Sequence, residues 1–83
     1  MTTVVVEYVY DPPLTDAEFQ RNGEKLGPCL QAHDVHWVAT YLATDRRHRV
    51  CVFEAADADA VRASFRSAGV AFERAWPASR FAP

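Results

Sequence analysis

The sequence predicts an α+β fold whose six elements run strand–helix–strand–strand–helix–strand. Short runs of β-branched and aromatic residues indicate four strands, two capped amphipathic segments indicate helices, and a short polar connection joins the two middle strands. This order is that of the ferredoxin-like fold, in which a four-stranded antiparallel sheet carries both helices on one face. The 83 residues suffice for one domain, residues 1–83, with an ordered core from about 4 to 77.

The first strand is predicted over residues 4–10, and it ends at two prolines, which cannot donate to a sheet ladder. The helix that follows begins at Thr15, an N-cap residue, and Glu18 three residues later completes a capping box. Pro28 predicts a kink or a break in this helix, because proline removes a backbone donor and collides with the preceding turn. His33 is expected near the negative carbonyl end of the helix.

The second half of the chain repeats this plan. Strands over 35–43 and 50–53 flank a polar connection at 44–48 and predict a β-hairpin. The second helix begins after Asp57 and ends before Gly69, where a left-handed residue would close a Schellman motif. A last strand is predicted over 71–76, before Pro77.

Alternation along the strands sorts their residues into two sets. The bulky set is Val4, Val6, Tyr8, Tyr10, Trp37, Ala39, Tyr41, Cys51, Phe53, Phe72, Arg74 and Trp76. The mixed set is Val5, Glu7, Val9, His36, Val38, Thr40, Leu42, Val50, Val52, Glu54, Ala71, Glu73 and Ala75. Two helices can cover only one face, and both sets are too apolar to stay in water, so we expect a homodimer that pairs sheet against sheet. Alternation alone does not decide which set faces the partner, and a bulge would swap the assignment downstream.

Composition narrows the function classes. Nine basic and eleven acidic side chains give a net charge of −2, which argues against a nucleic-acid or anionic-membrane partner. The apolar runs are too short to span a bilayer, and with no visible signal peptide we expect a cytoplasmic protein with Cys29 and Cys51 reduced. Arg46, Arg47 and Arg49 form the densest basic run, which is typical of a solvated hairpin tip.

Several motifs together resemble a bacterial family of small domains of unknown function whose named relatives are nickel-responsive or nickel-binding proteins. These motifs are Leu14-Thr15, Trp37 with Tyr41, Asp45, Cys51-Val52-Phe53-Glu54-Ala55, Asp59-Ala60-Val61-Arg62 and Ala68-Gly69, and the resemblance extends from Val4 to Trp76. It implies a ferredoxin-like fold and a dimeric α/β-barrel.

The resemblance implies no transferred nickel site. Where the nickel-binding relatives carry histidines, this chain has Tyr8-Val9, a first helix without histidine before His33, and Val70. Phenol and isopropyl groups do not replace imidazole as nickel ligands. We therefore expect no resident metal. Nickel or a related divalent ion remains an alternative, and its candidate ligands are His33, His36, His48, Cys51 or a carboxylate.

The leading hypothesis is a small homodimer that holds a small, partly apolar ligand between sheet and helices. If it is catalytic, cofactor-independent acid–base chemistry is expected from Glu7, His36 and Glu54, whose pKa values burial would shift. The same carboxylates could instead sit solvated or paired with arginines at strand ends. The expected ligand-binding residues are Tyr8, Trp37, Thr40, Tyr41, Cys51 and Arg74. A third hypothesis is a structural module without a ligand.

Overall fold

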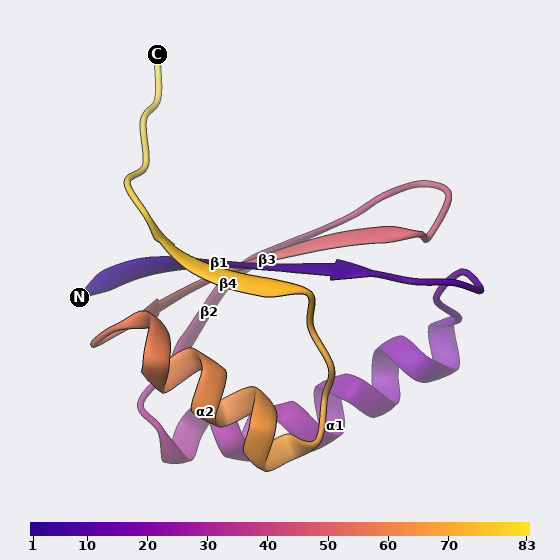
Figure 1. The fold of residues 1–83 in the computed structure, drawn as a ribbon, viewed down its shortest axis with the longest axis horizontal. Coiled ribbons are helices and arrows are strands. Elements are labelled where there is room, and N and C mark those ends of the chain that lie inside the picture. The colour runs from indigo at the N-terminus through magenta and orange to yellow at the C-terminus, as the bar shows by residue number, and fades with distance from the viewer.

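The computed structural model describes residues 1–83 and confirms the predicted order of elements. Strands β1 (Thr2–Val9), β2 (His36–Leu42), β3 (His48–Ala55) and β4 (Arg74–Ala78) form one antiparallel sheet in the order β2-β3-β1-β4. Helices α1 (Asp16–Ala32) and α2 (Ala58–Ala68) both lie on one side of this sheet, and the C-terminal tail leaves on the other side (Figure 1). Neither helix is long and apolar enough to cross a membrane.

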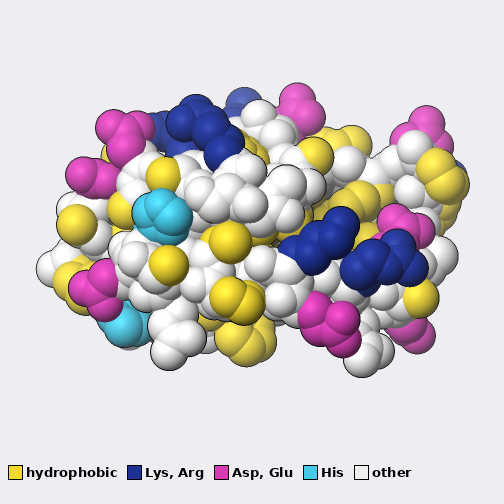
Figure 2. All heavy atoms as spheres, turned by 90° about the horizontal axis from the view of Figure 1, so that it is seen from below, with side chains coloured by type: hydrophobic (Ala, Val, Ile, Leu, Met, Phe, Trp, Pro, Cys, Tyr) yellow, Lys and Arg dark blue, Asp and Glu magenta, His cyan; other side chains and the backbone are white.

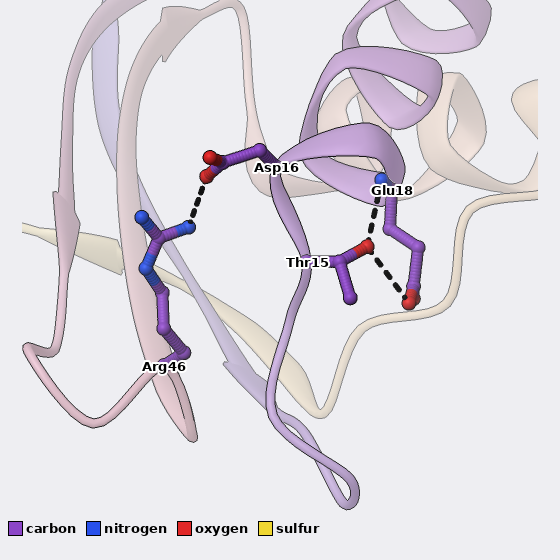
Figure 3. Close-up of polar contacts among 4 residues, drawn as sticks. All are labelled: Thr15, Asp16, Glu18 and Arg46. Atoms are coloured by element: carbon purple, nitrogen blue, oxygen red, sulfur yellow. Dashed lines mark hydrogen bonds and ion pairs between the residues drawn. The ribbon is translucent and has the colours of Figure 1, made fainter.

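Helix α1 begins with the predicted cap. The Thr15 hydroxyl accepts a hydrogen bond from the backbone N–H of Glu18 at 3.1 Å and donates to the Glu18 carboxylate at 3.1 Å (Figure 3). Asp16 in the first turn, where negative charge is favourable, also pairs with Arg46 of the β2–β3 turn at 2.7 Å (Figure 3). His33 closes the helix, as predicted, through a 2.9 Å contact of its Nδ1 with the Cys29 carbonyl.

The predicted break at Pro28 is wrong, because α1 continues through this residue to Ala32. Pro28 is exposed, so the one backbone hydrogen bond that it removes is lost on the solvent side, where water can bind the freed carbonyl. Helix α1 also contains two glycines four residues apart, Gly23 and Gly27.

Helix α2 confirms both predicted ends. Asp57 accepts from the Ala60 N–H at 2.8 Å, and Gly69 adopts a left-handed φ of 67°. The N–H of Val70 donates to the Phe65 carbonyl and that of Gly69 to the Arg66 carbonyl, which are the two bonds of a Schellman motif.

The core lies between the sheet and the helices, and most of its helical side chains come from α2. Val4, Val6, Cys51 and Phe53 point from β1 and β3 toward the helices and are buried, as is Phe65 of α2. The bulky set therefore faces the helices in these two central strands, and the mixed set faces the open side.

In β2 a bulge overturns the assigned faces. Trp37 lies opposite Phe53, but the register then shifts, so that Ala39 lies opposite Val52 and Thr40 opposite Cys51. The extra residue puts Trp37 and Thr40 on the helical side and sends Tyr41 to the open side, although alternation had placed Tyr41 with Trp37.

In β4 the assigned faces are reversed, and the predicted end before Pro77 is wrong. The strand begins at Arg74 and runs through Pro77, so Ala75 is buried opposite Val6, whereas Arg74 and Trp76 face the open side. Proline is tolerated here because β4 is an edge strand and needs no donor on its outer side.

Two glycine substitutions should change stability in opposite directions. Gly69→Ala should lower the free energy of unfolding by about 1 kcal/mol or more, because alanine resists the left-handed φ. Gly23→Ala should raise it by about 0.5–1 kcal/mol, because a Cβ there meets nothing within 4 Å and alanine favours the helix. Urea unfolding of both variants and the parent chain measures this, and equal effects would contradict the assigned backbone geometry.

Candidate functional site

A cavity of about 840 Å³ opens between α1 and the β2–β3 half of the sheet. Its volume lies within the range of roughly 300–1,000 Å³ typical of small-molecule sites. Most of the lining surface is apolar, and its apolar side chains come from α1, the sheet and the residue before β2: Phe19, Leu26, Leu30, Val35, Trp37 and Phe53. The polar lining comes from Gln31 of α1, from Asp34 in the α1–β2 connection, and from His36, Thr40, Arg49 and Cys51 of β2 and β3.

The composition of α1 explains why the cavity exists. This helix buries only Leu26, whereas the shorter α2 buries four residues against the sheet. Gly23 and Gly27 both line the cavity, and a Cβ at either position would meet nothing within 4 Å. The first helix therefore stands off the sheet along its glycine face, and the space beneath it stays open.

Arg49 is the main charged group of the site, and only 6% of it is exposed. Its guanidinium carbon lies 4.4 Å from the centre of the Tyr8 ring and 4.8 Å from that of Phe19. Nε donates to the Cys51 sulfur at 3.3 Å, and Nη1 donates to the Tyr10 hydroxyl at 3.3 Å. Burial opposes its charge, but Tyr8 and Cys51 outweigh burial, so the pKa of Arg49 lies above its ordinary value. The group is a buried cation.

A line of polar contacts connects the mouth of the cavity to this cation. The indole N–H of Trp37 donates to the Thr40 hydroxyl at 2.9 Å, and that hydroxyl lies 3.1 Å from the Cys51 sulfur, which Arg49 also contacts. The bulge in β2 makes this possible, because it turns both Trp37 and Thr40 toward α1.

Tyr8 adds a buried hydroxyl without a hydrogen-bond partner. Burial, followed by the nearby Cys51 thiol, raises the pKa of Tyr8 far above its usual range. Burial likewise raises the pKa of Tyr10. Both phenols therefore keep their protons at neutral pH.

Around the cavity, the helical side of the molecule carries charges of both signs. Lysine and arginine side chains lie near aspartate and glutamate, with apolar atoms between them (Figure 2). Arg46 and Arg47 of the hairpin turn are partly or fully exposed and pair with Asp16 and Asp11.

The structure brings half of the expected ligand-binding residues to the cavity. Trp37, Thr40 and Cys51 line it, and Tyr8 lies behind them against Arg49. Tyr41 and Arg74 lie on the open side of the sheet, Tyr41 because of the bulge and Arg74 because of the register of β4.

The three expected catalytic residues are not assembled in the cavity. His36 lines its mouth, where Nε2 lies 3.3 Å from Asp34. Glu7 lies on the open side and pairs with Arg74 at 2.8 Å, and it accepts from the Trp76 indole at 2.7 Å, which is the paired alternative. Glu54 is exposed at the strand end opposite His36.

Sequence reasoning missed Arg49 by grouping it with the hairpin arginines. The signal that could have found it is its position two residues before Cys51, on the same face of one strand. In the alternating pattern of β3, that face is the buried one.

The fold and the cavity together define a small α+β protein with a ferredoxin-like sheet and an open cavity beneath α1. The profile of the family described as nickel responsive protein SCO4226-like matches residues 5–77, so the chain belongs to this family. The crystal structure of SCO4226 from Streptomyces coelicolor A3(2) is similar, with a TM-score of 0.83 and 14% identity, covering 96% of this chain and 99% of that one. This likeness shows the fold. Among curated proteins, none matches the sequence significantly.

The donor side chains of one chain do not fit a nickel site. No three His, Cys, Asp or Glu side chains come together as a ligand group. His36 meets only Asp34, and the Cys51 sulfur lies beside the Arg49 cation, which opposes a second positive charge.

The Tyr8 hydroxyl supplies a test of this environment. Tyr8→Phe should leave the free energy of unfolding at pH 7 unchanged or raise it by up to about 1 kcal/mol, because the hydroxyl has no partner. The unfolded chain releases the Tyr8 proton near pH 10 while the folded chain holds it, so Tyr8 favours folding below pH 10 and this contribution is lost as pH rises. Above pH 10 this proton release should lower the free energy of unfolding of the parent chain by about 1.4 kcal/mol per pH unit. Tyr8→Phe should lack this contribution.

Urea unfolding of both proteins at a series of pH values from 7 to 11 measures the difference. Tyr10 is intact in both and serves as an internal control. Identical slopes above pH 10 would contradict the burial of Tyr8.

Proposed function

We propose that this protein binds a small, partly apolar organic molecule in the cavity between α1 and the sheet, and that it does so as a cytoplasmic homodimer. The observation that carries the binding proposal is the cavity itself. An apolar lining with a few converging polar groups is the usual composition of a small-molecule site. His36 at the mouth is the one expected acid–base residue that could reach a ligand there.

The glycine face of α1 supports binding over a purely structural role. A helix that only covered a sheet would gain stability from side chains that fill the space, at about 25 cal/mol per Å² of buried apolar area. Gly23 and Gly27 add no buried side-chain area, although larger residues would fit at both positions. The space is therefore kept open by residue choice.

Binding can be tested with 2-naphthamide, a neutral aromatic compound, by isothermal titration calorimetry. We expect saturable binding at one site per chain. Gly23→Leu combined with Gly27→Leu should weaken it at least about tenfold, which corresponds to roughly 60 Å² of lost apolar contact. The double alanine variant is the matched control and should bind like the parent. Absence of saturable binding to the parent chain would count against the proposal.

The open face of the sheet supports the homodimer. Val9, Val38, Tyr41 and Trp76 are each at least 40% exposed there, around the half-buried Val52. Soluble monomers rarely leave so large an apolar patch in water.

A second copy of the chain fits this face better than a charged partner. The ion pair of Glu7 and Arg74 lies near the patch and has no net charge, so it would not repel the same pair in a second chain. A hollow of about 290 Å³ bordered by Val5, Tyr41 and Val52 can receive a side chain from the opposing sheet. Two-fold symmetry would use this hollow twice.

Val52→Lys should abolish the dimer, because it places a charge in the centre of the sheet-to-sheet interface. Sedimentation velocity at micromolar concentration should show twice the chain mass for the parent and the mass of one chain for the variant. Ser67→Lys on the exposed surface of α2 is the control and should remain dimeric. A parent protein that sediments as a monomer would overturn the dimer.

A further inference from the structure

We infer that the ligand of the cavity carries one negative charge, as an aromatic carboxylate does, and that Arg49 binds this charge. The inference rests on the proposed ligand binding and specifies its chemistry. It starts from a buried cation whose position in the fold is otherwise unexplained.

Arg49 has no carboxylate partner. It takes part in none of the salt bridges of the chain, unlike Arg46, Arg47, Arg62 and Arg74. Its neighbours are the Tyr8 and Phe19 rings, the Tyr10 hydroxyl and the Cys51 sulfur, and none of them is a carboxylate. A buried charge without a counter-ion is costly, and faces of aromatic rings offset only part of that cost.

The guanidinium keeps a donor for a ligand. Nε and Nη1 are used by Cys51 and Tyr10, while Nη2 makes no hydrogen bond within the chain. Arg49 lines the cavity, so an anion there could accept from Nη2 and complete the charge balance. Charged hydrogen bonds of arginine to carboxylates are among the stronger polar contacts in proteins.

The number of buried charges in the cavity indicates the charge of the ligand. Asp34 is the remaining charged lining residue, but its side chain is 86% exposed and lies 3.3 Å from His36 at the mouth. A single buried cation favours a single anionic group. The apolar lining from Phe19 to Phe53 suits an aromatic or aliphatic body attached to it.

The test compares 2-naphthoate with 2-naphthamide, which share one shape and differ in charge. We expect the parent chain to bind 2-naphthoate at least about tenfold more tightly by calorimetry. Arg49→Gln should abolish this preference, so that 2-naphthoate and 2-naphthamide bind the variant with similar affinity. Arg46→Gln, which removes an exposed arginine, is the control and should keep the preference.

A second measurement, by NMR, uses the parent chain and so does not depend on whether Arg49→Gln folds. In ¹⁵N-labelled protein, the Nε resonance of Arg49 should shift on addition of 2-naphthoate and not of 2-naphthamide. Equal affinity for the two compounds, or a preference that Arg49→Gln retains, would overturn the anion site and leave the cavity proposal standing. Binding of neither compound would overturn both.

Discussion

The structure depends on the burial of Phe65 from α2 against the centre of the sheet. Its ring is fully buried, with ring centres 5.7 Å from Tyr8, 5.8 Å from Phe53 and 5.3 Å from Phe72. Edge-to-face and tilted contacts of this kind add to the hydrophobic gain. Because Phe65 joins β1, β3 and the segment before β4, α2 alone secures most of the sheet. Helix α1 is therefore free to lie farther away.

The packed core and the proposed binding site therefore lie in different halves of one small domain. The α2 half is packed, whereas the α1 half contributes Leu26 to the core and encloses the cavity. Strand β3 serves both layers, since Arg49, Cys51 and Phe53 face the helices and the residues between them face the open side. A dimer formed through the open side would leave the cavity accessible, because the two use opposite faces of the same sheet.

The sequence predicted those features that depend on local chemistry. The caps at Thr15, Asp57 and Gly69 follow from hydrogen bonds and backbone conformations set within a few residues, and all three are confirmed. The order of elements and the faces of β1 and β3 follow from simple alternation. Cys51, Thr40 and Trp37 were all expected among the ligand-binding residues, and all three line the cavity, although Thr40 had been assigned to the other face.

The features that sequence reasoning missed depend on tertiary context. A bulge at Trp37–Ala39 leaves no mark in the hydrophobic pattern, and the register of β4 is decided by pairing with β1. Proline in α1 and in β4 is tolerated because both positions are exposed, which the local sequence does not reveal. Arg49 looked like one of three turn arginines, yet its burial is decided by Tyr8 and Phe19, which lie 41 and 30 residues away along the chain.

The bulge has a further consequence for how this protein can be observed. The chain has two tryptophans, and the bulge and the register of β4 place them on opposite faces of the sheet: Trp37 lines the cavity, and Trp76 lies on the open side against Glu7. Their indole fluorescence therefore comes from two separate surroundings. A chain that retains a single indole gives an optical signal confined to one side, so the proposed ligand binding and the proposed dimerisation can be tested independently without an added label.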